Sequence, residues 1–331
     1  MFRVDLPKLI KATAALFMSF VLVSCGDFGF TVHVLYGEQG RGDKGINDAA
    51  FKSVLEGRDL LDATLVQWTP KDRDDAGYML TSVLSDPLRS PNELIILMTD
   101  TYDDLVLQVE CQFRDRKVLH LEGAETNCSK VLSVNYRMYA PGFLAGVAAV
   151  NASATKTIAV IGGGLTSDVK DAAAGFIDGV EEAGGTAIAT YLSPSANGFN
   201  NYDEGFRVAD ELYAEDEVDV IFVAAGATSL GVLEAAKKKN DRYVIGFDYD
   251  LSSMGENVVL GSVVKNLNFK LIDTMTTTDG GSFNGGHEVV GLRDDSVGFV
   301  VNPKMTDLVG NSHESFTAKA LTLELAYQGG Q

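Results

Sequence analysis

The chain has 331 residues, with 46 acidic and 27 basic side chains, a formal net charge of −19 at pH 7 and 46% hydrophobic residues. This length can bury a large core and, at ~100–200 residues per domain, suggests two domains. So acidic a surface repels phosphate backbones, which argues against nucleic acid as a partner, and solubility is the simplest account of the acidity.

The first segment, residues 1–24, is expected to be a secretory signal and not part of the fold. A start with three basic residues leads into a short apolar run, and LVSC (22–25) follows directly. The run is too short for a comfortable membrane span. LVSC resembles a bacterial lipobox, so we expect lipidation at Cys25, a tether over 25–29 and an exported protein on the periplasmic face of a bacterial membrane or the cell surface. The alternative is an ordinary signal that contains a cysteine.

The remaining chain alternates between strand and helix patterns. We expect strands at 30–37, 63–68, 93–99, 117–123, 130–136, 156–163, 186–192, 218–226, 243–248 and 257–264. Several are continuous apolar runs, typical of parallel strands covered on both faces. Helical patterns such as 169–185 and 228–240 lie between them, which predicts a doubly wound α/β architecture in two units. Ligands of such sheets bind at the carboxyl ends of the strands, so the strand-to-helix turns are where we look for function.

The first such turn is GRGDKGINDAAF (40–51), which places Asp43, Asn47 and Phe51 four residues apart. Asn47 and Phe51 share one face of the helix that begins here. Asp43 or Asn47 capping the helix, with Phe51 entering the core, is one interpretation. The rim of a binding site is the other.

Later turns carry further candidates. Phe199 lies in the polar loop PSANGFNNYDEG, where it has no strand or helix face to pack on, although it can also be buried beneath its own loop. Gly226 allows the backbone to approach either a ligand or a neighbouring helix. Asp248 and Asp250 in FDYD can accept hydrogen bonds from sugar hydroxyls, and Lys265 ends the next strand.

Catalytic signatures are poorly represented. IGGGLTSD (161–168) lacks the full phosphate-loop pattern, and the chain has no G-x-S-x-G elbow and no metal-spaced pair among its four histidines. We therefore expect a protein that is not an enzyme and has neither metal nor cofactor. Cys111 and Cys128 can form a disulfide in an exported protein or remain as two thiols.

Seven of these motifs, in this order, resemble the basic membrane protein (BMP) family of bacterial lipoproteins, the substrate-binding components of nucleoside ABC transporters. The motifs are GDKGINDAAF, YAPGFLAGVAA, GGGLTSDVKDAAAGFIDGV, GFNNYDEG, AAGATSLGV, IGFDYD and SVVKN. The similarity extends over nearly the whole mature chain. Each motif is weak alone, and the order makes them specific.

The resemblance implies a type I periplasmic binding protein, an α/β fold of two Rossmann-like lobes with parallel sheets around a ligand cleft. We expect lobe 1 to comprise 30–136 plus 250–283, and lobe 2 to comprise 137–249 plus 284–331. Lobe closure on a ligand, without chemistry, would be the functional step.

The resemblance also implies the ligand, a purine nucleoside (guanosine, inosine or adenosine), and an ABC permease as partner. Phe51 and Phe199 would stack on the base, with Asp43 near it and Gly226 in backbone contact. Asp248, chosen over Asp250 by a narrow margin, and Lys265 would face the ribose. Glu122 stands where the family strand ends in a ligand-contacting aspartate, and Asn47 belongs to the opening signature.

Two other binding functions remain open for this chain, and an exported enzyme that uses two carboxylates, such as a glycosidase, is the third and least favoured alternative. A lipoprotein of the same fold could sense a ligand or interact with a host molecule. A transport receptor of this fold could bind a sugar, because aromatic rings also stack on sugars.

Overall fold

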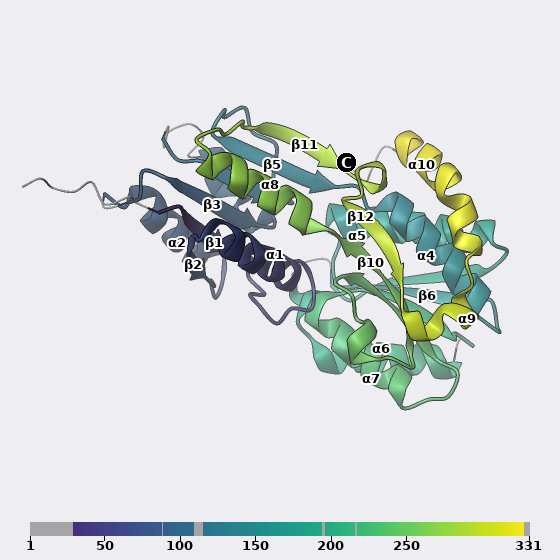
Figure 1. Ribbon diagram of the computed structural model, residues 1–331. Helices are drawn as coiled ribbons and strands as arrows, with labels where there is room; N and C mark the ends of the chain where they lie inside the picture. Colours follow the sequence, from purple (N-terminus) through teal and green to yellow (C-terminus); the bar gives the residue numbers. More distant parts are fainter. Residues whose placement is uncertain (1–28, 88, 109–114, 194–195, 216, 328–331) are drawn as a thin grey trace, which may run out of the picture.

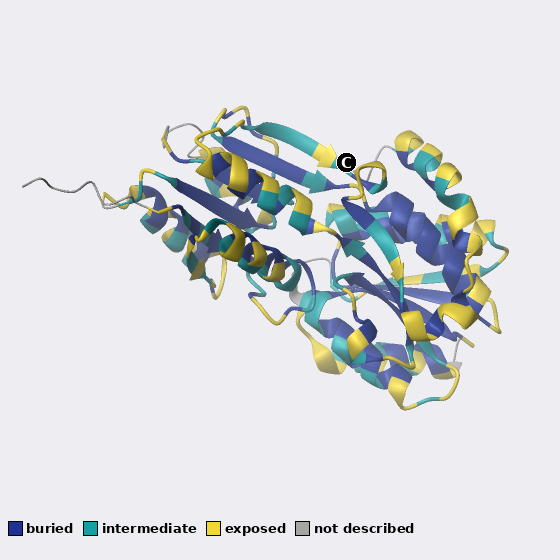
Figure 2. Ribbon diagram, viewed as in Figure 1, coloured by how far each residue is buried: buried dark blue, intermediate teal, exposed yellow. Residues whose placement is uncertain are grey.

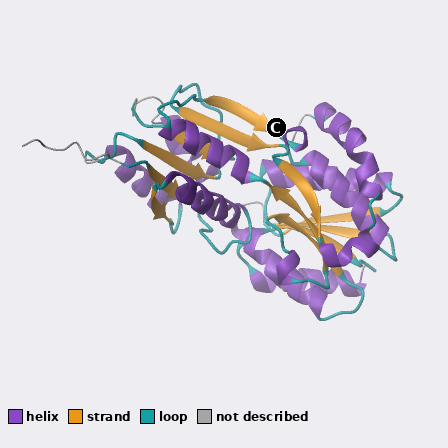
Figure 3. Cartoon of the chain, in the orientation of Figure 1, coloured by secondary structure: helices purple, strands orange, loops and turns teal. Residues whose placement is uncertain are grey.

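The computed structural model describes residues 29–87, 89–108, 115–193, 196–215 and 217–327. The expected signal, Cys25 and Cys111 lie outside these residues, and Cys128 is buried. The described chain forms two lobes side by side, each a sheet flanked by helices (Figures 1 and 3). Within the described residues, no helix has the length and apolar character needed to span a membrane.

The first lobe contains a six-stranded parallel sheet in the order β11-β5-β4-β3-β1-β2. The strands are β1 (Thr31–Leu35), β2 (Thr64–Trp68), β3 (Glu93–Met98), β4 (Val118–Leu121), β5 (Val131–Tyr136) and β11 (Gly286–Val290). Helices α1 (Ile46–Leu61) and α8 (Leu267–Asp279) pack on one face, and α2 (Arg73–Ser85) and α3 (Asp103–Gln108) pack on the other. Burial on both faces explains the continuous apolar run of β3.

The second lobe contains a six-stranded sheet in the order β12-β10-β9-β8-β6-β7, in which only β12 runs antiparallel. Its strands are β6 (Thr157–Gly162), β7 (Thr186–Tyr191), β8 (Val220–Ala224), β9 (Tyr243–Asp248), β10 (Val259–Lys265) and β12 (Val297–Val301). Its helices are α4 (Tyr139–Ala152), α5 (Ser167–Glu182), α6 (Tyr202–Glu215), α7 (Ser229–Lys237), α9 (Thr306–Val309) and α10 (Thr317–Ala326). Figure 2 shows the buried strands at the centre of each lobe.

The ten expected strands all form, and the fold class is confirmed. The sheet order differs from the expected lobe boundaries in two strands. β10 belongs to the second sheet and β11 to the first, so the chain crosses between lobes after β5, after β10 and after β11. Neither strand carries a local signal of which sheet it joins, because that choice is made by tertiary pairing.

Helices α4 and α5 pack with their backbones in close approach, and α4 is buried along nearly its whole length. A Cβ added at Gly146 would lie 2.2 Å from the carbonyl oxygen of Phe176, and one at Gly179 would lie 2.1 Å from that of Phe143. Glycine is therefore required where the two helices cross. This contact holds α4, which follows β5, against α5, which follows β6.

Candidate ligand-binding site

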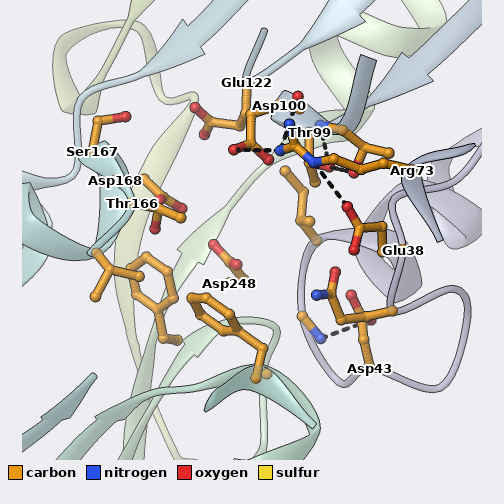
Figure 4. A pocket seen from close by; sticks show the side chains of 18 residues that line it. Glu38, Asp43, Arg73, Thr99, Asp100, Glu122, Thr166, Ser167, Asp168 and Asp248 are labelled. Carbon is orange, nitrogen blue, oxygen red and sulfur yellow. Dashed lines mark hydrogen bonds and ion pairs between the residues drawn. The ribbon is translucent and has the colours of Figure 1, made fainter. Parts of the chain in front are cut away.

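A cavity of about 180 Å³ lies between the lobes, where strands of both sheets end. The first lobe contributes Glu38, Gln39, Asp43, Gly45, Ile46, Arg73, Thr99, Asp100, Thr101 and Glu122. The second lobe contributes Thr166, Ser167, Asp168, Val169, Phe199, Gly226, Phe247 and Asp248. Figure 4 shows side chains of both lobes facing one another across this space. The cavity is therefore at the carboxyl ends of parallel strands, as the doubly wound architecture predicts.

One buried lysine organises the polar part of the cavity. The Lys265 Nζ atom lies 2.7 Å from Asp168 Oδ2, 2.8 Å from Glu122 Oε1 and 3.0 Å from Asp248 Oδ1. The Lys265 side chain is fully buried. Glu122 follows β4 of the first lobe, whereas the other three residues come from the second. This Lys265 centre (Lys265, Glu122, Asp168 and Asp248) therefore links the lobes by an ion pair.

Three carboxylates around one ammonium leave the Lys265 centre with excess negative charge. Burial raises the pKa of Glu122 to about 7 and that of Asp248 to about 6, despite the attraction of Lys265. Burial also acts on Asp168, but the charge of Lys265 and its hydrogen bond outweigh it and lower the pKa of Asp168. For Lys265 the three carboxylates outweigh burial and raise its pKa well above the usual value.

Two carboxylate oxygens of this centre have no hydrogen-bond donor other than the Lys265 ammonium among the described residues. Lys265 donates a hydrogen bond to Asp168. Glu122 Oε1 and Asp248 Oδ1 lie at ion-pair distance from the same ammonium and accept no hydrogen bond from any other described residue. One ammonium shared by three buried carboxylates leaves much of their acceptor capacity unused, so both oxygens favour a ligand that supplies hydroxyl or N–H groups.

Left-handed backbone turns direct side chains into the cavity. Thr99 and Glu122 follow the neighbouring strands β3 and β4, and Asp248 ends β9 of the other sheet; their φ angles are 64°, 55° and 62°. This conformation is uncommon for residues other than glycine and is unfavourable for a β-branched threonine. Three such residues lining one cavity indicate that the site's geometry is maintained at a local conformational cost.

Phe199, from the 3₁₀ turn η2 (Ala196–Phe199), forms an apolar wall with Phe247 and Val169. A Cβ at Gly163 would lie 2.7 Å from Phe199 Cδ1, and one at Gly226, whose φ is +52°, would lie 3.0 Å from the Phe199 carbonyl oxygen. Both glycines therefore leave room for Phe199. The packing presents an aromatic side chain to the cavity close to the carboxylates.

The turn between β1 and α1 contributes both to the N-terminus of α1 and to the lining of the cavity. The Asp43 carboxylate accepts hydrogen bonds from the backbone N–H groups of Gly45, Asn47 and Asp48 and from Asn47 Nδ2, at 2.9–3.1 Å. Asn47 Oδ1 accepts one from the Gly37 N–H at 3.0 Å. Asp43 also lines the cavity, and burial raises its pKa in spite of these bonds. Asp43 therefore accepts hydrogen bonds from the first N–H groups of α1, as the capping interpretation expects, and also lines the cavity, as the binding-site interpretation expects.

Two candidate residues lie away from the lining. The Arg41 guanidinium carbon is 4.4 Å from the centre of the Phe51 ring, so an arginine covers that aromatic face. Asp250 is exposed, and its carboxylate accepts hydrogen bonds from the N–H and hydroxyl of Ser252. The structure thus groups Asp43, Glu122, Phe199, Gly226 and Asp248 at the cavity, with Lys265 buried beside them and Asn47 supporting Asp43.

Asp168 and Phe247 were not singled out from the sequence. Asp168 lies in the segment 161–168, which was tested only as a phosphate loop, and its acid sits in the first turn of α5. The signal in the sequence was an acidic residue, Asp168, at a strand-to-helix turn, together with Lys265 at the end of another strand. Phe247 belongs to the apolar run of β9, where nothing separates it from core residues.

A pair of doubly wound lobes joined by three crossovers, with a cavity between them, is the architecture of type I periplasmic binding proteins. The chain also matches the model of the Bmp family, described as ABC transporter substrate-binding protein PnrA-like, over residues 32–322. It therefore belongs to the BMP family of ABC transporter substrate-binding proteins.

Similarity to other proteins supports the assignment to the BMP family. The chain is 28% identical to basic membrane protein A of Borreliella afzelii over 86% of this chain and 87% of that protein. It is 28% identical to a CD4+ T-cell-stimulating antigen of Listeria innocua, over 81% and 79% of the two chains. The crystal structure of an ABC transporter solute-binding protein from Aeropyrum pernix K1 has the same fold, with a TM-score of 0.75, 19% identity and 90% coverage of both chains.

Proposed function

We propose that this protein is a lipid-anchored receptor that captures a purine nucleoside between its lobes and delivers it to an ABC permease. The observation that carries the proposal is the aromatic wall at Phe199 beside two buried carboxylate oxygens, on Glu122 and Asp248, that share the single ammonium of Lys265 with Asp168 and accept no hydrogen bond from any other described residue. A nucleoside combines a flat apolar base with a ribose rich in hydroxyl donors. Each half thus has a complementary surface in one cavity.

The energetics favour a neutral ligand. Stacking of a base on an aromatic ring contributes roughly 1–3 kcal/mol by analogy with single-strand binders. Hydrogen bonds from ribose hydroxyls to carboxylates are charge-assisted and strengthen where water is excluded. A phosphate group would meet the negative excess of the Lys265 centre, so nucleotides are disfavoured.

Lobe closure completes the proposed site. Asp43 lies near the base and Gly226 approaches it through the backbone. Phe51 becomes the second stacking ring once the Arg41 guanidinium moves off its face. The ligand leaves chemically unchanged, so no catalytic group is required. Cys25 carries the lipid that keeps the receptor at the membrane.

The first test is to identify what the protein binds. Residues 26–331, without the lipid, are purified and denatured, and any released small molecule is identified by mass spectrometry. Recovery of an intact purine nucleoside supports the proposal. A released sugar without absorbance in the base band, or an empty protein that binds no nucleoside in a titration panel, contradicts it.

Replacing the aromatic wall tests the binding mode directly. We expect Phe199→Ala to weaken nucleoside binding by about 1–3 kcal/mol, a 5- to 150-fold rise in Kd measured by isothermal titration calorimetry. Phe269→Ala is the matched control, because Phe269 on α8 is 62% exposed and outside the cavity lining. Equal affinities of the two variants would contradict stacking on Phe199.

A further inference from the structure

A second charged group lines the cavity at a distance from Lys265 along the first sheet. Arg73 Nε donates to Glu38 Oε1 at 3.0 Å, and Arg73 Nη2 lies 3.2 Å from Asp100 Oδ2 (Figure 4). We call Arg73, Glu38 and Asp100 the Arg73 cluster. All three residues line the cavity and are partly exposed to it and to solvent.

The sheet order places this cluster away from the hinge. Glu122 follows β4, Asp100 follows β3, Glu38 follows β1, and Arg73 comes after β2, in the spatial order β4-β3-β1-β2. The crossovers leave from β5 and β11, beyond β4. Because both groups line one cavity, a nucleoside whose ribose lies at the Lys265 centre and whose base stacks on Phe199 can turn the polar edge of the base towards the Arg73 cluster.

The cluster retains hydrogen-bonding capacity of both kinds. A guanidinium has five N–H donors, and in the described residues Arg73 Nη1 has no acceptor while Nε and Nη2 are used. Likewise, Glu38 Oε2 and Asp100 Oδ1 accept no hydrogen bond from the described part of the chain. With one positive and two negative groups, the cluster is poorly suited to a phosphate and complementary to a neutral edge that has several N–H donors and one acceptor.

We propose that the Arg73 cluster is the specificity element for the base and selects guanine, an inference that rests on the proposed nucleoside-binding function. Guanine presents O6 as an acceptor beside N1–H and a 2-amino group, which match a guanidinium beside carboxylates. Hypoxanthine keeps O6 and N1–H but lacks the 2-amino group. Adenine places an N1 lone pair where the carboxylates require a donor, so the expected order of affinity is guanosine, then inosine, then adenosine.

The expected size of the preference for guanosine over adenosine is taken from comparable contacts between protein side chains and bases. A two-point contact between an arginine or a carboxylate and a base edge discriminates between bases by about 5- to 150-fold. We expect guanosine to bind the unmodified protein more tightly than adenosine by a factor in that range. Inosine should fall between them, because it loses only the donors of the 2-amino group.

The test is calorimetric titration of residues 26–331 with guanosine, inosine and adenosine. Arg73→Gln removes the charged donor, and the guanosine-to-adenosine preference should fall at least fivefold. Glu38→Gln removes a charged acceptor, and the guanosine-to-inosine preference should shrink. Arg58→Gln is the matched control, because Arg58 is a 40% exposed arginine in the last turn of α1, outside the cavity lining, and should leave every ratio unchanged.

The outcomes separate the two proposals. Nucleoside binding with ratios that Arg73→Gln and Glu38→Gln leave unchanged overturns the specificity assignment and leaves the proposed function intact. The same holds if the unmodified protein binds adenosine as tightly as guanosine. Absence of binding to all three nucleosides overturns both. Circular dichroism of each variant confirms that a change in affinity is not a loss of fold.

Discussion

The carboxyl group of Glu122 is subject to opposing electrostatic effects. Its carboxylate lies 2.8 Å from the ammonium of Lys265, yet its pKa is raised to about 7 because burial and the neighbouring Asp168 and Asp248 oppose its charge. A carboxyl whose pKa is higher in the folded than in the unfolded chain stabilises the fold at low pH. That stabilisation is lost as the pH rises from the unfolded pKa, near 4.5, through about 7.

The direction of the Glu122 pKa shift leads to a prediction for the stability of the ligand-free protein. The Tm of Glu122→Gln should match or fall below that of the unmodified protein at pH 5 and exceed it at pH 8, because glutamine cannot acquire the unfavourable charge. Each kcal/mol corresponds to about 2–4 °C in domains of 150–250 residues. Scanning calorimetry from pH 4.5 to 8.5 measures the difference. Glu125→Gln, an exposed neighbour, is the control, and parallel curves for Glu122→Gln and the unmodified protein would refute the effect.

At the residue scale, the sequence identified several residues that meet at the cavity, but it did not predict the contacts that each residue makes. Asp43, Glu122, Phe199 and Asp248 do meet at one cavity. Phe51, by contrast, is covered by Arg41 in this structure, and Asp250 stabilises its own turn. A side chain's direction depends on contacts across the fold, which spacing along the chain does not contain.

At the scale of elements, the closest packing in the second lobe joins α4 and α5. Four glycines meet backbone atoms of the opposite helix, with Gly142 and Gly146 on α4 and Gly175 and Gly179 on α5. Reciprocal small residues let the helix backbones approach, and any added side chain must push them apart. Since α4 is almost fully buried, such a shift would disturb the core beneath it.

Two glycine-to-alanine substitutions separate this packing from helix propensity. We expect Gly146→Ala to destabilise the protein by about 1–3 kcal/mol, because its Cβ would lie 2.2 Å from the Phe176 carbonyl oxygen. Gly77→Ala in α2 should be neutral or stabilising by up to about 1 kcal/mol, since its Cβ would be 3.6 Å from Leu105 Cδ1. Urea unfolding midpoints report both changes. Similar midpoints for the two variants would show that the helices can separate at little cost.

Strand and helix patterns allowed ten strands to be located from the sequence, because buried parallel strands are continuous apolar runs. β11 and β12 were not predicted. Both are five-residue edge strands with partly exposed side chains. β11 (GHEVV) has neither a continuous apolar run nor a clean alternation, whereas β12 (VGFVV) is a short apolar run whose signal was overlooked. Their positions follow from pairing with β5 and β10.

At the scale of the whole molecule, the Lys265 centre is a contact between lobes as well as a wall of the cavity. Glu122 comes from the first sheet, and Lys265 ends the strand from which the chain crosses back to that lobe. Removing a buried cation would leave three buried carboxylates without their counter-charge. Breaking a buried pair in this way is far more costly than breaking an exposed one.

We therefore expect Lys265→Met to destabilise the ligand-free protein by about 3–5 kcal/mol. Lys319→Met is the matched control, because Lys319 forms an ion pair with Glu182 at the surface, is 46% exposed, and should cost about 0–1 kcal/mol. Thermal unfolding at pH 7.5, where the carboxylates are ionised, measures both. A Lys265→Met Tm equal to that of the control would mean that the carboxylates take up protons or water at no cost.

The interleaved lobes also determine the order in which the protein can be assembled. A ribosome completes residues 31–136 early, but the first sheet gains its outer strand β11 and its covering helix α8 only after residue 290 has been made. Neither lobe is a continuous piece of chain, so neither can finish folding as an independent fragment. Long-range pairing of this kind slows folding. A nascent chain with this topology therefore stays incomplete until its last third has been synthesised.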